Sequence, residues 1–294
     1  MPARQPFTYL CQTLARGPKA GRADLHLHTT ASDGNYRPEE VVDLARRCGL
    51  AAIAITDHDT LAGVPAARAA APASLEVIAG VEITAEHLGR ELHLLGYFID
   101  GDGSALAAAL ADVRESRTTR YHAMVERLRA IGVSVQDEPF AVVPDALGRR
   151  HLAELLVRQG KAGSVREAFQ RWLGDDRPAD VAKRRIPVGE AIRLVRAAGG
   201  VASWAHPSYD GAKRHLADLA TLGLGAVEAE YPDIRRTQAD EVRAWARQLG
   251  LAITGGSDCH GPGPRGVGAY TISDAELDEL RNHRRRGEAK CEGV

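Results

Sequence analysis

The segment at residues 24–28, Asp-Leu-His-Leu-His, constrains the fold of this chain more than any other feature. In an extended strand neighbouring side chains point to opposite faces, so His26 and His28 share one face and the two leucines share the other. The sequence Ser-Asp-Gly-Asn at 32–35 is typical of a loop and places Asp33 just beyond the strand. Two imidazoles and a carboxylate at a strand end favour a metal chelate. A strand with two half-exposed histidines would explain the same residues, so the later segments must decide.

Short apolar segments recur along the chain and are typical of buried parallel strands. Segments with helical patterns separate most of them, and this alternation indicates a parallel barrel or an open sheet. In both architectures, functional sites collect at the carboxyl ends of the strands. The expected strands are 50–55, 75–81, 91–98, 201–204, 226–229 and 251–256, and the expected helices are 38–49, 61–71, 188–198, 210–222, 234–249 and 273–286.

Nine residues that can bind metal stand at or beside these strand ends. Six of them are histidines, out of eleven in the whole chain. Imidazole and carboxylate together suit Zn²⁺, Mn²⁺ or Fe²⁺, and nine such groups exceed what a single ion needs. The sequence therefore predicts a cluster of two or three divalent ions. The nine candidates are His26, His28, Asp33, His58, Glu82, His93, His206, Asp258 and His260.

The alternation stops between residues 101 and 186, where helical patterns and many arginines take over. Helices are expected at 104–131, 148–159 and 165–173, and most of the arginines should lie on solvated helix faces. We interpret this segment as an inserted helical subdomain. The expected organisation is a lead-in at 1–21, a first barrel part at 22–100, the insertion at 101–186, and a second barrel part with a C-terminal helix at 187–294.

Composition narrows the class of protein. The formal net charge is −1, which argues against nucleic-acid binding through bulk charge but leaves a local basic groove open. The four cysteines lie far apart without a C-x-x-C pair, as expected in a reducing cytoplasm. No segment resembles a membrane span, and no obligate protein partner is evident.

The motifs in combination resemble the PHP (polymerase and histidinol phosphatase) superfamily of metal-dependent phosphoesterases. The resemblance implies a distorted (β/α)₇ barrel with a trinuclear site at its carboxyl-terminal rim. The motifs are DLHLH at 24–28, TDHD at 56–59, GVEI at 80–83, His93, AHP at 205–207 and SDCH at 257–260.

The resemblance also implies how three ions would be shared. It assigns His26, His28, Glu82 and Asp258 to one ion, Glu82, His93 and His206 to a second that shares Glu82, and Asp33, His58 and His260 to the third. Many members have histidine where this chain has Asp33, and a carboxylate favours a harder ion such as Mn²⁺. Mn²⁺ is therefore the favoured ion.

Within the superfamily, the chain most resembles the branch with a helical insertion. Its members act on nucleoside 3′,5′-bisphosphates or as 5′–3′ exonucleases on short RNA. The sequence Gly-Arg-Arg-His-Leu at 148–152 and the pair Arg117-x-x-Arg120 match that branch less specifically than the metal motifs do. The expected substrate is a nucleotide with two phosphates, or the 5′ end of a short RNA or DNA oligonucleotide.

Hydrolysis of a phosphate ester requires charge neutralisation on the phosphoryl oxygens and a proton for the leaving oxygen. We expect Glu82 to bridge two ions, and His206 or His260 to supply the proton. Arginine suits a second phosphate because its planar fork can donate two hydrogen bonds at once. The candidate substrate-binding residues are Arg117, Arg120, Arg149, His151 and Arg265.

Other residues and functions stay open at this level. Asp57 and Asp59 either orient His58 or are solvated loop acids. Three alternative functions are a phosphatase like histidinol phosphatase, an amidohydrolase-type C–N hydrolase, and a nucleic-acid-binding module on a degenerate barrel. The histidines outside the motifs are expected on surface or helix faces, and they are His87, His122, His215 and His283.

Overall fold

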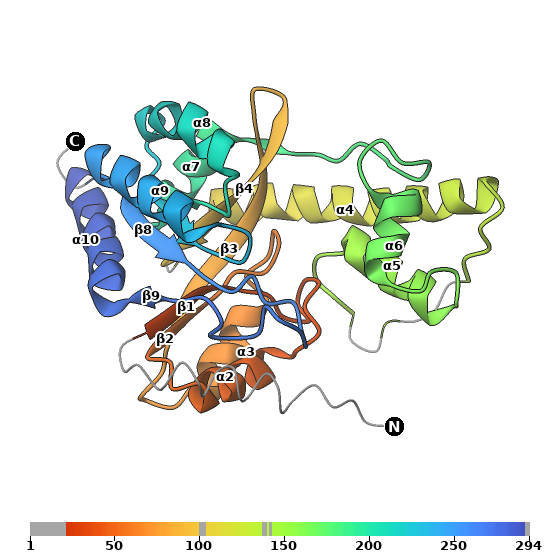
Figure 1. The fold of residues 1–294 in the computed structure, drawn as a ribbon, viewed down its shortest axis with the longest axis horizontal. Helices are drawn as coiled ribbons and strands as arrows, with labels where there is room; N and C mark the ends of the chain where they lie inside the picture. The colour runs from red at the N-terminus through yellow and green to blue at the C-terminus, as the bar shows by residue number, and fades with distance from the viewer. Residues whose placement is uncertain (1–21, 100–103, 137–139, 141–142, 292–294) are drawn as a thin grey trace.

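A computed structural model describes residues 22–99, 104–136, 140 and 143–291. Within these ranges, one mixed sheet curls almost into a barrel (Figure 1), in the order β8-β7-β6-β4-β3-β2-β1-β9, with β5 beside β3. A parallel bridge between Leu27, at the end of β1, and Cys259, after β8, joins the two sides of the curved sheet. The strands are β1 Arg22–Leu27, β2 Ala52–Ile55, β3 Glu76–His87, β4 Arg90–Tyr97, β5 Ile186–Pro187, β6 Val201–Trp204, β7 Ala226–Glu230, β8 Ala252–Gly255 and β9 Ile272–Ser273.

The sheet is mixed because β3 and β4 form a long hairpin. β4 runs antiparallel to both β3 and β6, whereas β1–β2–β3 and β6–β7–β8 pair in parallel. Only Leu88 and Gly89, with φ of 51° and 73°, separate the two strands, and so short a connection can only join antiparallel neighbours. The expectation of a parallel barrel or open sheet was wrong for β4, which runs antiparallel to both of its neighbours. Glu82 and His93 consequently lie inside long strands and not at carboxyl ends.

Helices surround the barrel at the expected places. The first, Pro38–Arg47, begins at a proline, has two acids in its first turn and two arginines in its last, which complements the helix dipole. Its buried face, which includes Val41 and Ala45, packs with Ile53 and Ile55 of β2 in one hydrophobic cluster. The helices are α2 Pro38–Arg47, α3 Gly63–Ala70, α4 Ser104–Ala130, α5 Arg149–Arg158, α6 Val165–Ala168, a π-helical turn Phe169–Leu173, α7 Val188–Ala197, α8 Tyr209–Thr221, α9 Arg236–Gln248 and α10 Asp274–Cys291.

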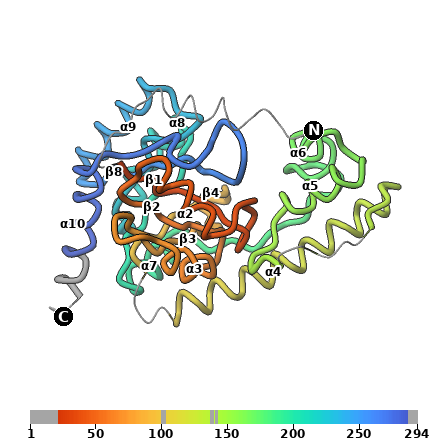
Figure 2. Tube along the Cα trace, turned by 90° about the horizontal axis from the view of Figure 1, so that it is seen from below, coloured from red at the N-terminus to blue at the C-terminus, as the bar shows by residue number. Residues whose placement is uncertain are grey.

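The helices of the expected insertion stand to one side of the barrel (Figures 1 and 2). The first half of α4 packs on the barrel, where Leu106 and Leu110 join the cluster that contains Val81 and Ile83. Its second half joins a separate cluster, in which Met124 and Leu128 pack with α5, α6 and the π-helical turn. Helix α4 therefore contributes to two hydrophobic cores, one in the barrel and a smaller one next to the barrel mouth.

The expected lead-in at residues 1–21 lies outside the described residues. In the part of the chain that the structure describes, no helix combines the length and the apolar character that crossing a membrane requires.

Candidate metal centre

All nine predicted metal-binding residues converge at one end of the barrel, around the carboxylate of Glu82. Glu82 is buried inside β3 and has imidazole nitrogens on several sides. Sequence reasoning placed this residue at a strand end, whereas it lies inside β3. The distances to its two oxygens are 2.8 Å from His93 Nδ1, 3.0 Å from His58 Nδ1, 3.1 Å from His206 Nε2, 3.2 Å from His28 Nε2 and 3.5 Å from His26 Nε2.

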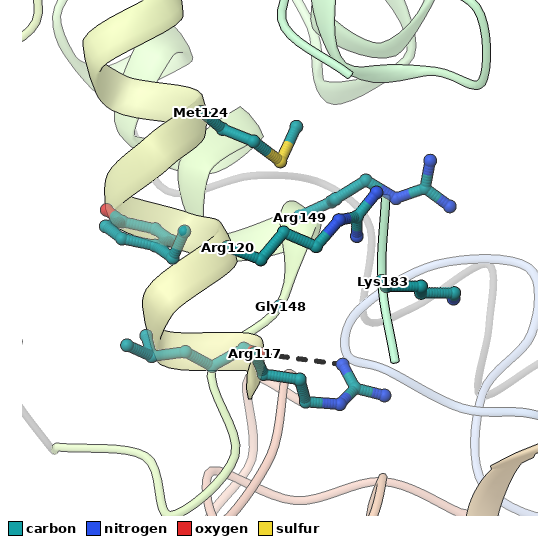
Figure 3. Close-up of a pocket in the computed structure, with 8 residues that line it drawn as sticks. Arg117, Arg120, Met124, Gly148, Arg149 and Lys183 are labelled. Carbon is teal, nitrogen blue, oxygen red and sulfur yellow. Dashed lines mark hydrogen bonds between the residues drawn. The ribbon is translucent and has the colours of Figure 1, made fainter. Parts of the chain in front are cut away.

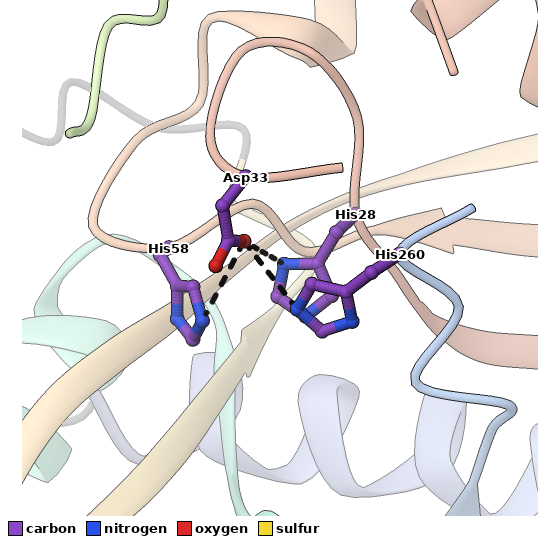
Figure 4. A group of neighbouring side chains, drawn as sticks. All are labelled: His28, Asp33, His58 and His260. Carbon is purple, nitrogen blue, oxygen red and sulfur yellow. Dashed lines mark ion pairs between the residues drawn. The ribbon is translucent and has the colours of Figure 1, made fainter. Parts of the chain in front are cut away.

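A second carboxylate, Asp33, lies at the centre of a neighbouring group (Figure 4). Its Oδ1 lies 3.4 Å from His260 Nε2, 3.8 Å from His58 Nε2 and 3.9 Å from His28 Nδ1. His28 and His58 thus face Asp33 with one ring nitrogen and Glu82 with the other. These two imidazoles therefore connect the group around Asp33 with the group around Glu82.

Asp258 completes the arrangement from the loop after β8. Its Oδ1 lies 3.4 Å from His28 Nε2 and 3.6 Å from His26 Nε2. The same oxygen lies 3.4 Å from His260 Nδ1. The group of His26, His28, Glu82 and Asp258 that the family resemblance implies is therefore contiguous in space.

The donor atoms fit divalent cations. Several of them are buried, face one another and lack a hydrogen-bond partner within the described residues, which is costly unless a cation fills the space. Seven of the nine residues fall into three overlapping groups of mutually close ligand atoms: His28, Asp33, His58 and His260; His26, His28 and Glu82; and His58, Glu82 and His93. The buried unpaired atoms are His26 Nε2, both ring nitrogens of His28, Asp33 Oδ1, His58 Nδ1 and His93 Nδ1.

The imidazoles and carboxylates of the centre shift one another's pKa values. Against the opposing effect of burial, Asp258 and Glu82 raise the pKa of His28 to about 10 and Glu82 raises that of His93 to about 9, so a cation would displace protons from these two imidazoles. Burial alone would raise the pKa of Glu82, but the imidazoles of His93 and His58 hold that pKa well below its usual range, so the carboxylate is ionised. Burial lowers the pKa of His58 to about 4 against the opposing effect of Glu82, so its imidazole is neutral and keeps a lone pair for a cation.

The backbone is unusual where it presents these side chains. His206, Asp258 and Asp59 follow β6, β8 and β2, and all three have a positive φ, of 28°, 51° and 51°. Residues other than glycine rarely adopt this conformation, and in folded proteins it concentrates at functional sites, where surrounding contacts enforce it. The three strand ends thus share a strained turn that directs polar groups toward the barrel mouth.

Glu228, on β7, contacts two of the predicted ligands, and sequence reasoning did not select it. It is fully buried, lies 3.1 Å from His26 Nδ1 through Oε1, and accepts a hydrogen bond from the His206 backbone at 2.6 Å. A carboxylate that binds the far nitrogen of a metal-ligating imidazole fixes the orientation of the ring. The available signal was a glutamate inside an apolar strand, since a buried carboxylate needs a polar partner.

We expect Glu228→Gln to weaken metal binding about 10- to 100-fold, because the amide cannot accept both hydrogen bonds that the carboxylate accepts. Titration with a competing chelator measures the affinity. Glu230→Gln is the matched control, since Glu230 lies on the same strand and pairs with Arg243. Equal affinities for Glu228→Gln and wild type would contradict the orienting role.

Asp57 and Asp59 are both fully buried, so the interpretation as solvated loop acids was wrong. Asp57 accepts hydrogen bonds from the backbone and hydroxyl of Thr29 and from the hydroxyl of Ser32, all between 2.6 and 2.7 Å. These bonds fix the loop that carries Asp33. Asp59 accepts from the backbone of Thr84 at 2.8 Å and from Arg117 at 2.7 Å.

Three of the five candidate substrate-binding residues line one pocket beside the metal centre (Figure 3): Arg117, Arg120 and Arg149. Lys183 also lines this pocket, although sequence reasoning did not select it. Its Nζ lies 2.5 Å from Glu91, which in turn lies 3.2 Å from His93 Nε2. Burial lowers the pKa of Lys183 to about 8, and Glu91 partly opposes this.

The other wall of the pocket lies beside the metal centre. A Cβ atom built on Gly148 would lie 3.5 Å from Arg117 Nη1 and 3.7 Å from Asp33 Oδ2. We name this pocket, lined by Arg117, Arg120, Arg149 and Lys183, the basic pocket. It borders the metal centre through Asp33 on one side and through Glu91 and His93 on the other.

The remaining two candidates lie elsewhere. Both ring nitrogens of His151 are engaged, since Nδ1 accepts from the Gly148 backbone and Nε2 donates to Ser32 O, each at 2.9 Å. His151 thus ties the start of α5 to the loop of Asp33. Arg265 is outside the basic pocket and contacts Asp233 at 2.8 Å and Asp258 at 3.4 Å.

Residues 24–173 match the family model of the PHP domain, and residues 237–289 match that of the PHP-associated region. A 5′-3′ exoribonuclease of Haemophilus influenzae is 32% identical over 81% of this chain and 90% of its own length. A 3′,5′-nucleoside bisphosphate phosphatase of Chromobacterium violaceum is also 32% identical, over 83% of this chain and 88% of its own length.

A solved structure from Bifidobacterium adolescentis, described as that of a metal-dependent phosphoesterase, has the same architecture. The TM-score is 0.80 and the sequence identity is 29%, over 90% of this chain and 97% of the other. The likeness therefore includes the helices beside the barrel as well as the barrel itself.

Proposed function

The chain belongs to the PHP family and is a metal-dependent phosphoesterase, and on this premise we propose that it hydrolyses a nucleoside 3′,5′-bisphosphate or the 5′ end of a short oligonucleotide. The observation that carries the proposal is the basic pocket, which opens next to the predicted ligands. A substrate with one phosphate would use the metal centre alone. A second phosphate gives the cationic side chains a partner.

We further propose a centre of two or three divalent ions held by the nine residues, with Mn²⁺ favoured and Zn²⁺ or Fe²⁺ as alternatives. When bound, such ions neutralise phosphoryl charge and supply hydroxide near neutral pH. Glu82 contributes a fixed negative charge shared between neighbouring sites. Of the six imidazoles, that of His206 is the most exposed, at 33%. It is therefore our first candidate for protonating the leaving oxygen, with His260 as the second.

The basic pocket is pre-organised by its own carboxylates. Arg149 donates through Nη1 to Asp175 at 2.6 Å and to Leu173 O at 3.2 Å, and its guanidinium lies over the ring of Phe169. Arg120 donates to Asp180 at 3.1 Å. A guanidinium carries five N–H donors, so these contacts hold the side chain and leave donors for a phosphate.

Phosphate release from a panel of nucleotides, measured together with bound metal, tests the proposal. We expect more than one equivalent of metal per chain, and faster turnover of 3′,5′-bisphosphates or 5′-phosphorylated oligonucleotides than of p-nitrophenyl phosphate or histidinol phosphate. Full activity with a single equivalent of metal would contradict the multinuclear centre. A clear preference for histidinol phosphate would contradict the substrate class.

We expect Arg149→Ala to raise KM for a bisphosphate substrate by about tenfold, equivalent to about 1.4 kcal/mol, because a guanidinium group that binds the second phosphate is lost. A small phosphodiester should be hydrolysed at nearly the wild-type rate. Initial-rate kinetics with both substrates measure the difference. Arg150→Ala is the matched control, since Arg150 follows Arg149 in the first turn of α5 but pairs with Glu154 at 3.0 Å. Equal losses on both substrates would place Arg149 at the reacting phosphate instead.

A further inference from the structure

Three side chains that can bind metal meet at a second place, where the tip of the β3–β4 hairpin lies against α8. They are His87 from the end of β3, and His215 and Asp218 from α8. One ligand atom from each lies within 4.8 Å of the others. The rings of His87 and His215 meet edge to face, with centroids 5.4 Å apart and an interplanar angle of 78°. Sequence reasoning placed both histidines on surface or helix faces.

Backbone geometry explains why the three converge. His87 pairs with Arg90 in the last register position of the hairpin, directly before the tight turn at Leu88 and Gly89. His215 and Asp218 are three residues apart on a helix, a spacing that places side chains on the same face. The convergence therefore depends on two regular elements and not on a loop.

One atom in this group lacks a partner. His87 Nε2 is buried and makes no hydrogen bond to any described residue. A buried ring nitrogen without a partner is unfavourable, and in neutral imidazole the nitrogen without a proton is a metal ligand. The second histidine and the carboxylate of Asp218 are the groups within reach.

We infer that His87, His215 and Asp218 form a second metal site that binds one Zn²⁺ ion, with water as the fourth ligand. Two imidazoles and a carboxylate are a common set of zinc ligands. Zinc imposes no strict coordination geometry of its own, so side chains from a hairpin and a helix can bind it together. His87 lies five positions after Glu82 in β3, which is about 16 Å along an extended strand. The site is therefore separate from the metal centre, and its existence does not depend on the proposed substrate.

The position of the site gives the ion a structural role. The hairpin carries Glu82 and His93 of the metal centre, and α8 begins directly after the loop with His206. A zinc ion between His87 and α8 would hold these two elements together at the end away from the centre. It would thus reduce the freedom of the hairpin without touching the substrate.

Crystals of the metal-loaded protein, soaked in zinc and measured at the zinc edge, locate the ion directly. We expect an anomalous peak about 2.0–2.2 Å from His87, His215 and Asp218, in addition to peaks at the metal centre. Peaks at the metal centre with none beside His87 would overturn the inference.

Stoichiometry in solution gives an independent test. Wild type, His215→Ala and Asp218→Asn are equilibrated at the same buffered free zinc concentration and analysed for metal. Wild type should bind one equivalent more than either variant, and zinc should raise its Tm by at least about 3 °C more, because an ion that binds only the folded state stabilises it. His122→Ala, which removes an exposed imidazole on α4, is the control and should match wild type.

Two variants are used because a substitution could disturb the fold as well as remove a ligand. Asp218 is exposed, so Asp218→Asn should leave the fold intact and change only the ligand. If both variants bound as much zinc as wild type and showed the same zinc-dependent Tm, the three residues would form no site. Loss of phosphoesterase activity on bisphosphates would leave this result unchanged, so failure of the proposed function and failure of the zinc site are distinguishable.

Discussion

Glu82→Gln should lower kcat by more than about a hundredfold, because it removes the one charge that five imidazoles share. Substitutions that disturb only the partners of metal ligands already cost about 10- to 100-fold in affinity or activity. Glu82 contacts His93 at 2.8 Å and His58 at 3.0 Å directly. A neutral amide cannot replace a carboxylate shared between two cations, so metal content should fall together with turnover. Steady-state kinetics and elemental analysis on the same preparation measure both.

Glu86→Gln is the control for this substitution. Glu86 lies four residues further along β3, on the same face of the strand, and its nearest basic partner is Arg185 at 3.9 Å. Glu86→Gln should therefore keep nearly full activity. If Glu82→Gln retained as much as a tenth of the wild-type kcat, the bridging role of Glu82 would be wrong.

The convergence of His26, His28 and Asp33 was predictable because these three residues are close in sequence. Alternation in a strand places His26 and His28 on one face whatever the rest of the fold does. The loop composition after this strand puts Asp33 near its end. Helix bounds were also close to expectation, because a proline and two acids define the start of α2, and apolar periodicity defines its buried face.

The hairpin was not predictable in the same way. The segment from Glu82 to His87 has too few apolar residues to read as a buried strand, yet β3 continues through it because β4 supplies hydrogen-bond partners along its whole length. Tertiary pairing overrides local pattern in such cases. The same hairpin places His87 against α8, and no sequence pattern relates residues that are more than a hundred positions apart.

The residues that contact the predicted metal ligands and the basic pocket could not be predicted from local sequence, for a related reason. Glu228 reaches His26 from β7, and Lys183 joins the basic pocket through Glu91 of β4. Each contact depends on which strand neighbours which, and therefore on the strand order of the closed sheet. Residue type alone indicates only that a buried charge must have a partner.

Arg117→Met should destabilise the fold by about 3–5 kcal/mol, because removing one partner of a buried ion pair leaves the other charge uncompensated. Arg117 donates to Asp59 at 2.7 Å and to Thr84 at 2.9 Å, with its side chain 14% exposed and that of Asp59 fully buried. The pair joins α4 to the segment after β2 that carries His58, and the bond to Thr84 joins it to β3, which carries Glu82. Urea unfolding in the presence of a chelator measures this loss without a contribution from metal binding.

A second ion pair of nearly equal length provides the control for Arg117→Met. Arg46 lies 2.8 Å from Asp43 on α2 but is 56% exposed, so Arg46→Met should cost less than about 1 kcal/mol. Asp59 has a φ of 51°, which asparagine also tolerates, so Asp59→Asn can remove the buried charge without disturbing the backbone. The double variant Arg117→Met/Asp59→Asn should therefore be much less destabilised than the sum of the two single variants. Simple additivity, or a loss below 1 kcal/mol for Arg117→Met alone, would show that Arg117 serves only as a wall of the basic pocket.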